Sequence, residues 1–540
     1  MKFSNNLTSR YSALMTANIW LMLCAFLVII PIGVIVASLG EFDAEIWEFL
    51  LDYQLPILLK NTIFLTVSVA FGVITLGTST AWLVCMYRFP LQRIFRWTMM
   101  LPLAIPAYVL AFVQLGIFEY SGTISTFLRQ SMGFENGLPD IRNGFGVATI
   151  MSLTFYPYVY LLAKNAFDSM GNRSLEVGAS LGLSPLRSFF KIALPMARPW
   201  IAGGAILALM EVLADFGTVS VFGFETFTTA IYQSWFGFFS LQTAKQLASL
   251  LIGFVFILIA LEQLSRGKKR FETTGRGTHH QQTTLTGKGK WLAFAYCLTI
   301  LSLSFIIPVI QLIIWAVNTW QKTDISELFT QIWHSMATGG IAACLICVFA
   351  FGIALAHRQV KNTWTNVLSR ISTLGYAIPG TVLAVGVFVP IAWVDNVLIE
   401  YLALEDTQIL RGTLFALLLA YLIRFLALGV SSIQSGMQRL KPSHIEAAHT
   451  LGSVGIHNIR RIYLPLLSGS MSTALLISFV DVVKEMPITL MMRPFDWEML
   501  SVKIYALTSE GIYDQAALPA LIIVLIGLIP VILFARMETS

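Results

Sequence analysis

Long apolar stretches alternate with shorter polar ones along the whole chain of 540 residues. Each stretch is about 20 residues long, which is the length a helix needs to cross the hydrocarbon core of a bilayer. The pattern therefore predicts an all-α polytopic membrane protein with about 12 transmembrane helices. The apolar stretches cover residues 18–38, 62–86, 97–117, 144–164, 199–221, 246–263, 291–316, 337–356, 372–394, 409–430, 468–490 and 515–535.

Composition and charge agree with this interpretation. Hydrophobic residues make up 56% of the chain and charged residues 12%, whereas about 25% of the residues of a soluble protein are charged. If the N-terminus lies inside, 25 of the 35 Lys and Arg residues fall in cytoplasmic segments, as the positive-inside rule expects. We therefore expect both termini in the cytoplasm. The net charge of +6 follows from this topology, and we expect no nucleic-acid partner.

One polar motif occurs twice, with its matched positions offset by 270 residues, and such repeats have to be found before other elements are assigned. We name its copies the first repeat loop, residues 176–195, and the second repeat loop, residues 446–465. The first contains Glu176, Gly182, Leu194 and Pro195, and the second contains Glu446, Ala447, Ala448, Gly452, Leu464 and Pro465.

Local rules predict a helix-turn-helix in each repeat loop. Gly182 and Gly452 are placed to end a short helix, because glycine adopts the left-handed cap conformation easily. Ser184-Pro185 favours the start of a second helix. Leu194-Pro195 and its counterpart are expected to close that helix, since proline cannot continue the hydrogen-bond pattern.

The pattern Glu-Ala-Ala, then Gly six residues after the Glu, then Ile-x-Leu-Pro resembles the cytoplasmic coupling loop of binding-protein-dependent ABC importer permeases. The first copy departs from it with Val177-Gly178. The resemblance implies a type I ABC importer permease fold in the bacterial inner (cytoplasmic) membrane. It also implies that two copies of a nucleotide-binding ATPase subunit dock at the loops and that a periplasmic substrate-binding protein delivers the substrate. The alternative is an amphipathic turn between membrane helices.

The repeat and the polar stretches suggest domain boundaries. A basic linker at 264–290 separates six spans from six, which implies two parallel pseudo-symmetric halves. Its pair His279-His280 is a candidate metal ligand or a solvated part of the linker. The expected divisions are 1–56 with the first helix, 57–263 as the first permease domain, the linker at 264–290, 291–331 with helix seven, and 332–533 as the second permease domain.

Two prolines and four acids lie inside predicted spans. Pro106 and Pro379 sit in similar sequences and are expected to bend their helices, either as part of a gate or as packing kinks. The acids are Glu211, Asp215, Asp481 and Glu485, and each pair has a spacing of four that places it on one helix face. Mid-span charges are costly, so these acids should face the bundle interior. They either guide a cation or pair with Lys484 and Arg424.

Several kinds of chemistry are not indicated. No G-x-x-x-x-G-K-[ST] motif occurs, so we expect that the chain binds no cofactor and that a partner uses the ATP. Cys344 and Cys347 have C-x-x-C spacing, but they lie in an apolar span, where helix packing is the alternative to a redox or metal role. No metal site could be assigned, and no hydrolase constellation was found.

Four stretches resemble the fused permeases of ferric-iron ABC importers, namely Tyr156–Ala163, Leu209–Thr218, Tyr421–Leu426 and Val483–Leu490. This resemblance implies transport of Fe(III), a hard cation that prefers oxygen ligands. Thiamine, phosphonate and polyamine permeases are related and remain alternatives. A secondary transporter with twelve spans is a rival class that would need no ATPase.

Overall fold

The computed structural model describes residues 2–40, 47–48, 50–120, 122–132, 140–170, 178, 180–266, 282–360, 362–403, 408–441, 443, 446, 450 and 455–539. Within these residues, 12 helices are long and apolar enough to cross a membrane. This confirms the predicted number, and each predicted stretch overlaps one of these helices. The polytopic all-α interpretation of the apolar pattern is therefore confirmed.

The chain forms two compact units, and each unit draws on both halves of the sequence. Unit A consists of Asp43–Gln233, Leu250–Thr323 and Lys503–Ser540. Unit B consists of Met1–Phe42, Ser234–Ser249 and Asp324–Val502. The domain boundaries expected from the sequence follow the repeats. The compact units differ from them because the first helix of the chain packs in unit B and the seventh predicted span packs in unit A.

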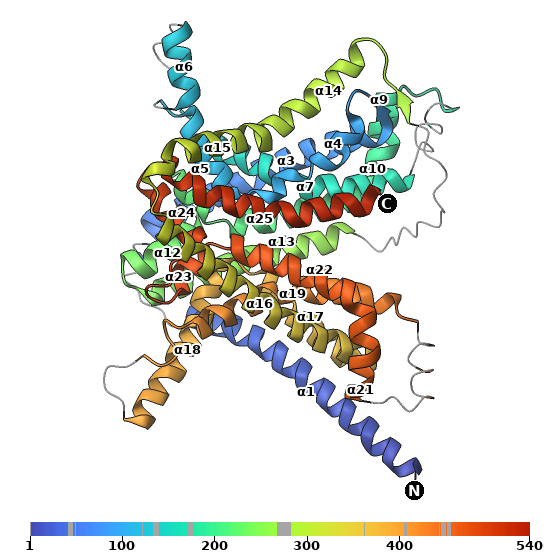
Figure 1. Cartoon of the computed structure of the whole chain (residues 1–540), viewed down its shortest axis with the longest axis vertical. Helices are drawn as coiled ribbons and strands as arrows, with labels where there is room; N and C mark the ends of the chain where they lie inside the picture. The colour runs from blue at the N-terminus through green and yellow to red at the C-terminus, as the bar shows by residue number, and fades with distance from the viewer. Residues whose placement is uncertain are drawn as a thin grey trace. The chain divides into compact units, whose positions relative to one another are not determined.

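Three long helices form the centre of unit A, namely α3 (Leu55–Met86), α7 (Gly144–Met170) and α10 (Leu194–Ala214), which pack on one another (Figure 1). Small residues allow this close packing, as is usual for membrane helices. A Cβ atom added to Gly77 of α3 would lie 2.6 Å from the Cβ of Val159 in α7.

The remaining elements of unit A surround this centre. Helix α15 packs on α25, and both contact α5. The elements are a π-helical turn Leu50–Gln54, β1 (Tyr87–Arg88), α4 (Gln92–Thr98), α5 (Ala107–Phe118), α6 (Thr123–Met132), α9 (Pro185–Ser188), α11 (Gly217–Val221), α12 (Phe227–Tyr232), β2 (Thr283–Thr284), α14 (Lys288–Leu301), α15 (Ile307–Thr319) and α25 (Tyr513–Thr539).

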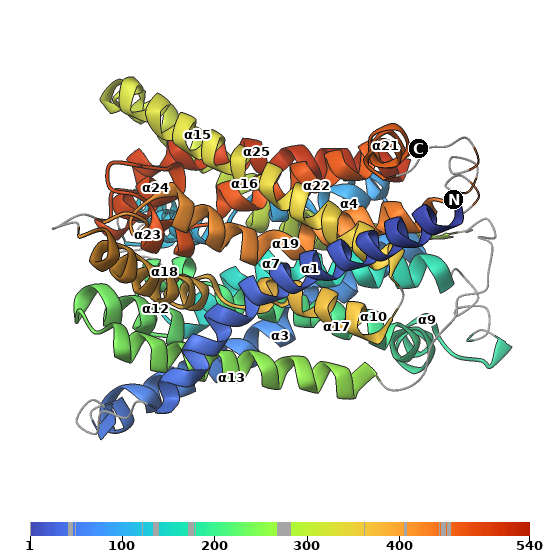
Figure 2. The ribbon, with the colours of Figure 1, turned by 90° about the horizontal axis from the view of Figure 1, so that it is seen from below.

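Unit B has a centre of the same kind, made of α16 (Ile325–Gln359), α19 (Leu414–Arg439) and α22 (Leu464–Lys484). Gly436 of α19 permits the contact with α22, since an added Cβ would lie 2.2 Å from the Ser470 Oγ. Helix α1 (Lys2–Ala37) packs along α16, α17 and α18 (Figure 2).

The other elements of unit B are short or peripheral. They are α17 (Thr363–Ser372), α18 (Gly380–Leu402), α21 (Ile456–Asn458) and α23 (Pro487–Met492). Two helices, α13 (Leu241–Arg266) and α24 (Leu500–Ser509), continue from one unit into the other.

The sequence repeat is also a structural repeat. Helices α7 and α19 begin at Gly144 and Leu414, and α10 and α22 run over 194–214 and 464–484, so their bounds differ by the same 270 residues. Each unit is therefore built around one copy of the same three-helix arrangement.

Candidate functional site

The first repeat loop contains the helix end that the sequence predicted. Gly182 has a φ of +70°, which is in the left-handed region. The backbone N–H of Leu183 donates to the Gly178 carbonyl oxygen at 2.8 Å, as in a Schellman cap. Gly182 thus closes a helical turn, which confirms the prediction for this residue. Glu176 lies outside the described residues.

The second helix of this loop begins as predicted. Ser184 is the N-cap of α9, and its hydroxyl accepts a hydrogen bond from the backbone N–H of Arg187 at 3.4 Å. Pro185 occupies the first turn, where its missing N–H costs nothing. A Cβ on Gly178 would lie 1.9 Å from the Ser188 Oγ. The packing of these two turns therefore favours glycine at position 178, where the second copy has Ala448.

The prediction that Leu194-Pro195 closes this helix is wrong. Helix α9 continues through a π-helical turn, Phe189–Ala193, directly into α10, and Pro195 lies in the first turn of α10. Proline cannot donate the usual hydrogen bond, and the wider π turn just before it changes the hydrogen-bond pattern at that point. The loop is consequently joined to a membrane helix without a break.

The second repeat loop has the same continuation. A π-helical turn, Ile459–Tyr463, leads into α22, with Leu464-Pro465 at its start. Glu446 is helical and exposed, whereas Ala447, Ala448 and Gly452 lie outside the described residues. The turn before α21 is made by Gly455, which has a φ of +60°. The sequence motif did not predict this turn, although glycine is in general a strong signal for a turn.

Both loops expose one aliphatic side chain at the same position of the repeat. Leu186 is 71% exposed and Ile456 is 84% exposed. Four residues further on, the copies differ, with an exposed Phe190 in the first and an exposed Arg460 in the second. The shared aliphatic position is therefore a candidate contact for a partner that has to recognise both loops.

Pro106 and Pro379 do not bend continuous helices, so that expectation is corrected. Each proline follows a 3-10 turn, Leu101–Ala104 or Leu374–Ala377, and is the N-cap of the next helix, α5 or α18. The physical reason is that the residue before proline disfavours the helical conformation. In both repeats, the chain therefore enters the helix through a short extended segment.

Asp215 and Glu485 lie at the same position of the two repeats and make equivalent hydrogen bonds. Asp215 follows the last residue of α10, and its carboxylate accepts from the backbone N–H groups of Thr218 at 2.8 Å and Val219 at 3.3 Å. Glu485 follows α22 and accepts from the N–H groups of Ile488 and Thr489, both at 3.1 Å. Each acid thus satisfies the first turn of a short helix, α11 or α23.

The two other acids remain inside their helices. Glu211 of α10 and Asp481 of α22 are half-buried, and each has an interaction partner. The expected sharing of one helix face with Asp215 and Glu485 is incomplete, because both helices end one residue before those acids. The sequence pattern alone did not distinguish the two positions.

Arg424 lies next to Glu485 in unit B. Its Nη1 donates to the Ile378 carbonyl oxygen at 3.0 Å, one residue before Pro379. A Cβ on Gly380 would lie 3.1 Å from this Nη1 and 2.7 Å from the Glu485 Oε1. The guanidinium and the carboxylate therefore both lie beside Gly380, where the chain enters α18. Unit A has Thr154 at the position of Arg424, so this charged arrangement belongs to one repeat only.

The described residues offer little to a resident metal or cofactor. They contain no group of three or more His, Cys, Asp or Glu side chains placed to hold a metal ion. Cys344 is exposed and Cys347 is buried, and both are free thiols.

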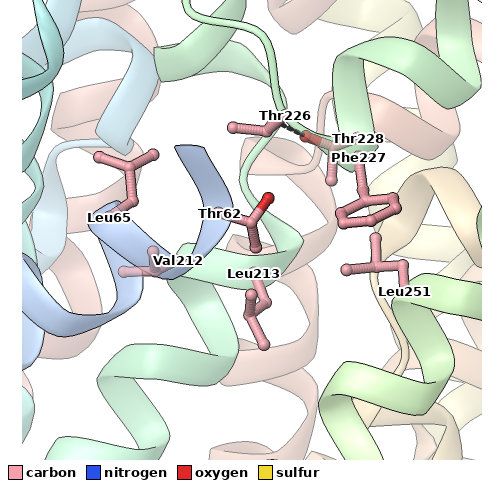
Figure 3. A pocket seen from close by; sticks show the side chains of 8 residues that line it. All are labelled: Thr62, Leu65, Val212, Leu213, Thr226, Phe227, Thr228 and Leu251. Carbon is pink, nitrogen blue, oxygen red and sulfur yellow. Dashed lines mark hydrogen bonds between the residues drawn. The ribbon is translucent and has the colours of Figure 1, made fainter. Parts of the chain in front are cut away.

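A small pocket in unit A is lined by apolar side chains and by threonines such as Thr62 and Thr228 (Figure 3). Its lining carries no charged group that would attract a cation.

Comparison with known proteins gives a consistent result. The family profile of binding-protein-dependent transport system inner membrane components matches residues 73–262 and 348–539. An Fe(3+)-transport system permease protein of Haemophilus influenzae is 28% identical over 91% of both chains. A ferric transport system permease protein of Actinobacillus pleuropneumoniae is 24% identical over 80% of this chain and 64% of its own length. A sulfate transport system permease protein of Salmonella typhimurium is 27% identical over 37% of this chain and 70% of its own.

Proposed function

Because the chain belongs to the family of binding-protein-dependent transport system inner membrane components, we propose that it carries Fe(III) across the membrane as the permease of an ATP-driven importer. The family and the helices define the broader role. The chain is a transport subunit of an ABC importer, it has the type I ABC permease fold in two pseudo-symmetric halves, and it is a multi-pass protein of the inner membrane.

Iron is the substrate that the relatives favour. One protein that matches 91% of this chain is a permease for Fe(3+), and a second with the same coverage is a probable ABC transporter permease whose name gives no substrate, whereas the sulfate permease matches 37% of the chain. A 2-aminoethylphosphonate permease of Salmonella typhimurium also matches 35% of the chain. A relative that spans both repeats is the stronger guide, because both repeats would line a translocation path. Phosphonate, thiamine and polyamine remain the alternatives to test.

The two repeat loops supply the contact with the energy source. We propose that two copies of a nucleotide-binding ATPase subunit dock on them, and that the chain itself binds no ATP. The observation that carries this proposal is the equivalent exposure of Leu186 and Ile456 in loops that continue without a break into α10 and α22. Movement of a docked subunit would be transmitted directly to these membrane helices.

The remaining parts follow from the positive-inside rule. Both termini and both repeat loops lie in the cytoplasm in this proposal, and a periplasmic substrate-binding protein delivers the substrate on the other side. One copy of the chain provides both halves of the path.

Uptake of labelled ferric iron tests the proposal in cells with and without the chain, with thiamine, phosphonate and polyamine uptake measured in parallel. We expect iron uptake alone to be lost. Unchanged iron uptake together with loss of another substrate would move the proposal to that substrate. Co-purification is the second measurement. If removing the chain left iron uptake unchanged and no ATPase subunit co-purified with the chain, its role in an ATP-driven iron importer would be refuted.

A further inference from the structure

The end of the linker between the two repeats is attached to the end of α3 in unit A. Strand β2 pairs in parallel with β1, with Tyr87 opposite Thr283 and Arg88 opposite Thr284. The backbone N–H of Leu285 donates to the Arg88 carbonyl oxygen at 3.1 Å. A polar linker that only joined two halves would need no such pairing, because its backbone could bond to water.

A side chain of the linker also caps α3. The Gln282 Nε2 donates to the carbonyl oxygens of Val84 at 3.3 Å and Cys85 at 3.2 Å. These carbonyls belong to the last turn of α3, where the helix itself provides no partner. The segment Val84–Arg88 is therefore bonded to the linker in two ways, by the backbone pairing of β1 with β2 and by the side-chain amide of Gln282.

This segment contacts the first repeat loop through aromatic rings. Trp82 is buried at the end of α3, and its ring centroid lies 4.8 Å from that of Phe189, in the π-helical turn of the loop. The same ring lies 5.2 Å from Phe167 of α7 and 6.3 Å from Tyr87 of β1. Aromatic pairs at such distances contribute to stability beyond the burial of their area, so a shift of β1 would disturb contacts that reach the loop.

The second repeat uses a different device at the same place. Arg358, the counterpart of Arg88, donates from its guanidinium to the carbonyl oxygens of Met437 and Leu440 at the end of α19, shortly before the second repeat loop. The Arg88 side chain is exposed, and its backbone carbonyl bonds to the linker instead. The second repeat thus holds the end of α19 with Arg358, whereas the first repeat has the linker at the end of α3 in addition to the ion pair between Arg96 and Asp168 of α7 at 2.6 Å.

We propose that residues 282–285 form a positioning strand that holds the first repeat loop in place through Tyr87, Trp82 and Phe189. In this scheme the linker helps to hold the first repeat loop, whereas Arg358 holds the end of α19 before the second repeat loop. Where the proposed function holds, on which this part of the inference rests, the strand sets how the ATPase subunit at the first loop is engaged. Gln282 and Leu285 are positioning residues in this scheme and touch neither substrate nor ATP.

Spin labels on the two loops test the positioning in the full chain in lipid nanodiscs. The labels are attached at Leu186→Cys or Ile456→Cys, in a background with Cys344→Ser because that thiol is exposed. Gln282→Glu replaces an N–H donor with an oxygen that faces two carbonyls, and Leu285→Pro removes the N–H that bonds to Arg88. Thr286→Pro is the matched control, since its backbone N–H makes no hydrogen bond with the described residues.

We expect Gln282→Glu and Leu285→Pro to shorten the rotational correlation time at position 186 by about twofold or more, with no change at position 456. Trp82→Ala should do the same while β1 and β2 remain paired. The same correlation times as in Thr286→Pro at position 186 would overturn the proposal. An equal change at both positions would also overturn it, because that result means general loosening of the protein.

A second measurement separates this inference from the proposed function. In the complex reconstituted with the ATPase and the binding protein, Leu285→Pro should lower the substrate transported per ATP by about threefold or more relative to Thr286→Pro, because loss of one hydrogen bond lowers the population of the held loop by about that factor. An equal ratio in the two variants would contradict a role of the strand in coupling. Failure of the unmodified chain to bind any ATPase would refute the proposed function, while the spin-label result would still decide the positioning.

Discussion

The acid Asp215 provides the sharpest test of whether the membrane acids guide a cation or hold the structure together. Its carboxylate accepts three hydrogen bonds, from the Thr218 N–H at 2.8 Å, the Thr218 hydroxyl at 2.9 Å and the Val219 N–H at 3.3 Å. Asn can keep all three, because its amide oxygen accepts from the N–H groups and its amide nitrogen can donate to the hydroxyl. Ala keeps none of them.

The expected magnitudes differ accordingly. Replacing a helix-capping side chain by Ala costs about 0.5–2 kcal/mol, and where the N–H groups left without a partner are buried the cost lies within the range of about 1–3 kcal/mol for an unsatisfied group. We therefore expect Asp215→Ala to lose about 2–3 kcal/mol of stability. Asp215→Asn should lose about 1 kcal/mol, which is the difference between a charge-assisted and a neutral hydrogen bond.

Thermal unfolding in detergent and substrate uptake per inserted molecule measure the two roles separately. If the acid is structural, Asp215→Asn should keep most of the stability and uptake of the unmodified chain, whereas Asp215→Ala should lose both. Glu485→Gln and Glu485→Ala provide the matched pair in the second repeat. If Asp215→Asn were as stable as expected but transported no better than Asp215→Ala, the negative charge itself would be needed and the structural explanation would be refuted.

Three further substitutions have defined outcomes. The Gly182→Pro variant should insert normally but reduce uptake at least about tenfold, because the φ of +70° at Gly182 lies far from the value of about −65° that proline requires. Normal uptake of labelled ferric iron by this variant would contradict the prediction. Asp395→Asn should lower the thermal midpoint by several degrees, because the buried Asp395 carboxylate bonds to the Arg411 side chain at 2.9 Å and to the Leu410 N–H at 2.8 Å; Glu400→Gln, the same chemical change at an exposed acid of α18, is the control. Gly77→Val should prevent the packing of α3 on α7 and lower the yield of folded protein in size-exclusion chromatography, whereas Gly253→Val, where an added Cβ meets nothing within 4 Å, should not.

Patterns that depend on neighbours in the sequence predicted the structure well. The twelve spans follow from apolar runs, whose length is imposed by the bilayer. The cap at Ser184 and the left-handed Gly182 follow from local backbone preferences. The repeat itself was visible because an offset of 270 residues is shared by several residue types at once.

Features that depend on distant partners could not be predicted in this way. Pro195 was expected to end a helix, but the π turn before it allows the helix to continue. Asp215 was placed inside a span because no residue before it signals the end of α10. Its counterpart Glu485 is followed by Pro487, which is a recognisable start of the next helix. The pairing of β1 with β2 joins residues far apart in the chain, and a run of two residues gives no strand signal.

The packing of α1 in unit B has a consequence for how the protein is made. Helix α1 ends at Ala37, whereas its partner α16 begins only at Ile325. At a synthesis rate of about 5–20 residues per second, α1 waits for roughly 15–60 s before that partner exists. During this time its inner face, which includes Leu21, Cys24 and Val28, has to tolerate lipid. That face is thus first a lipid-exposed surface of a nascent chain and only later a packed one, so a polar substitution there should impair biogenesis before it impairs transport.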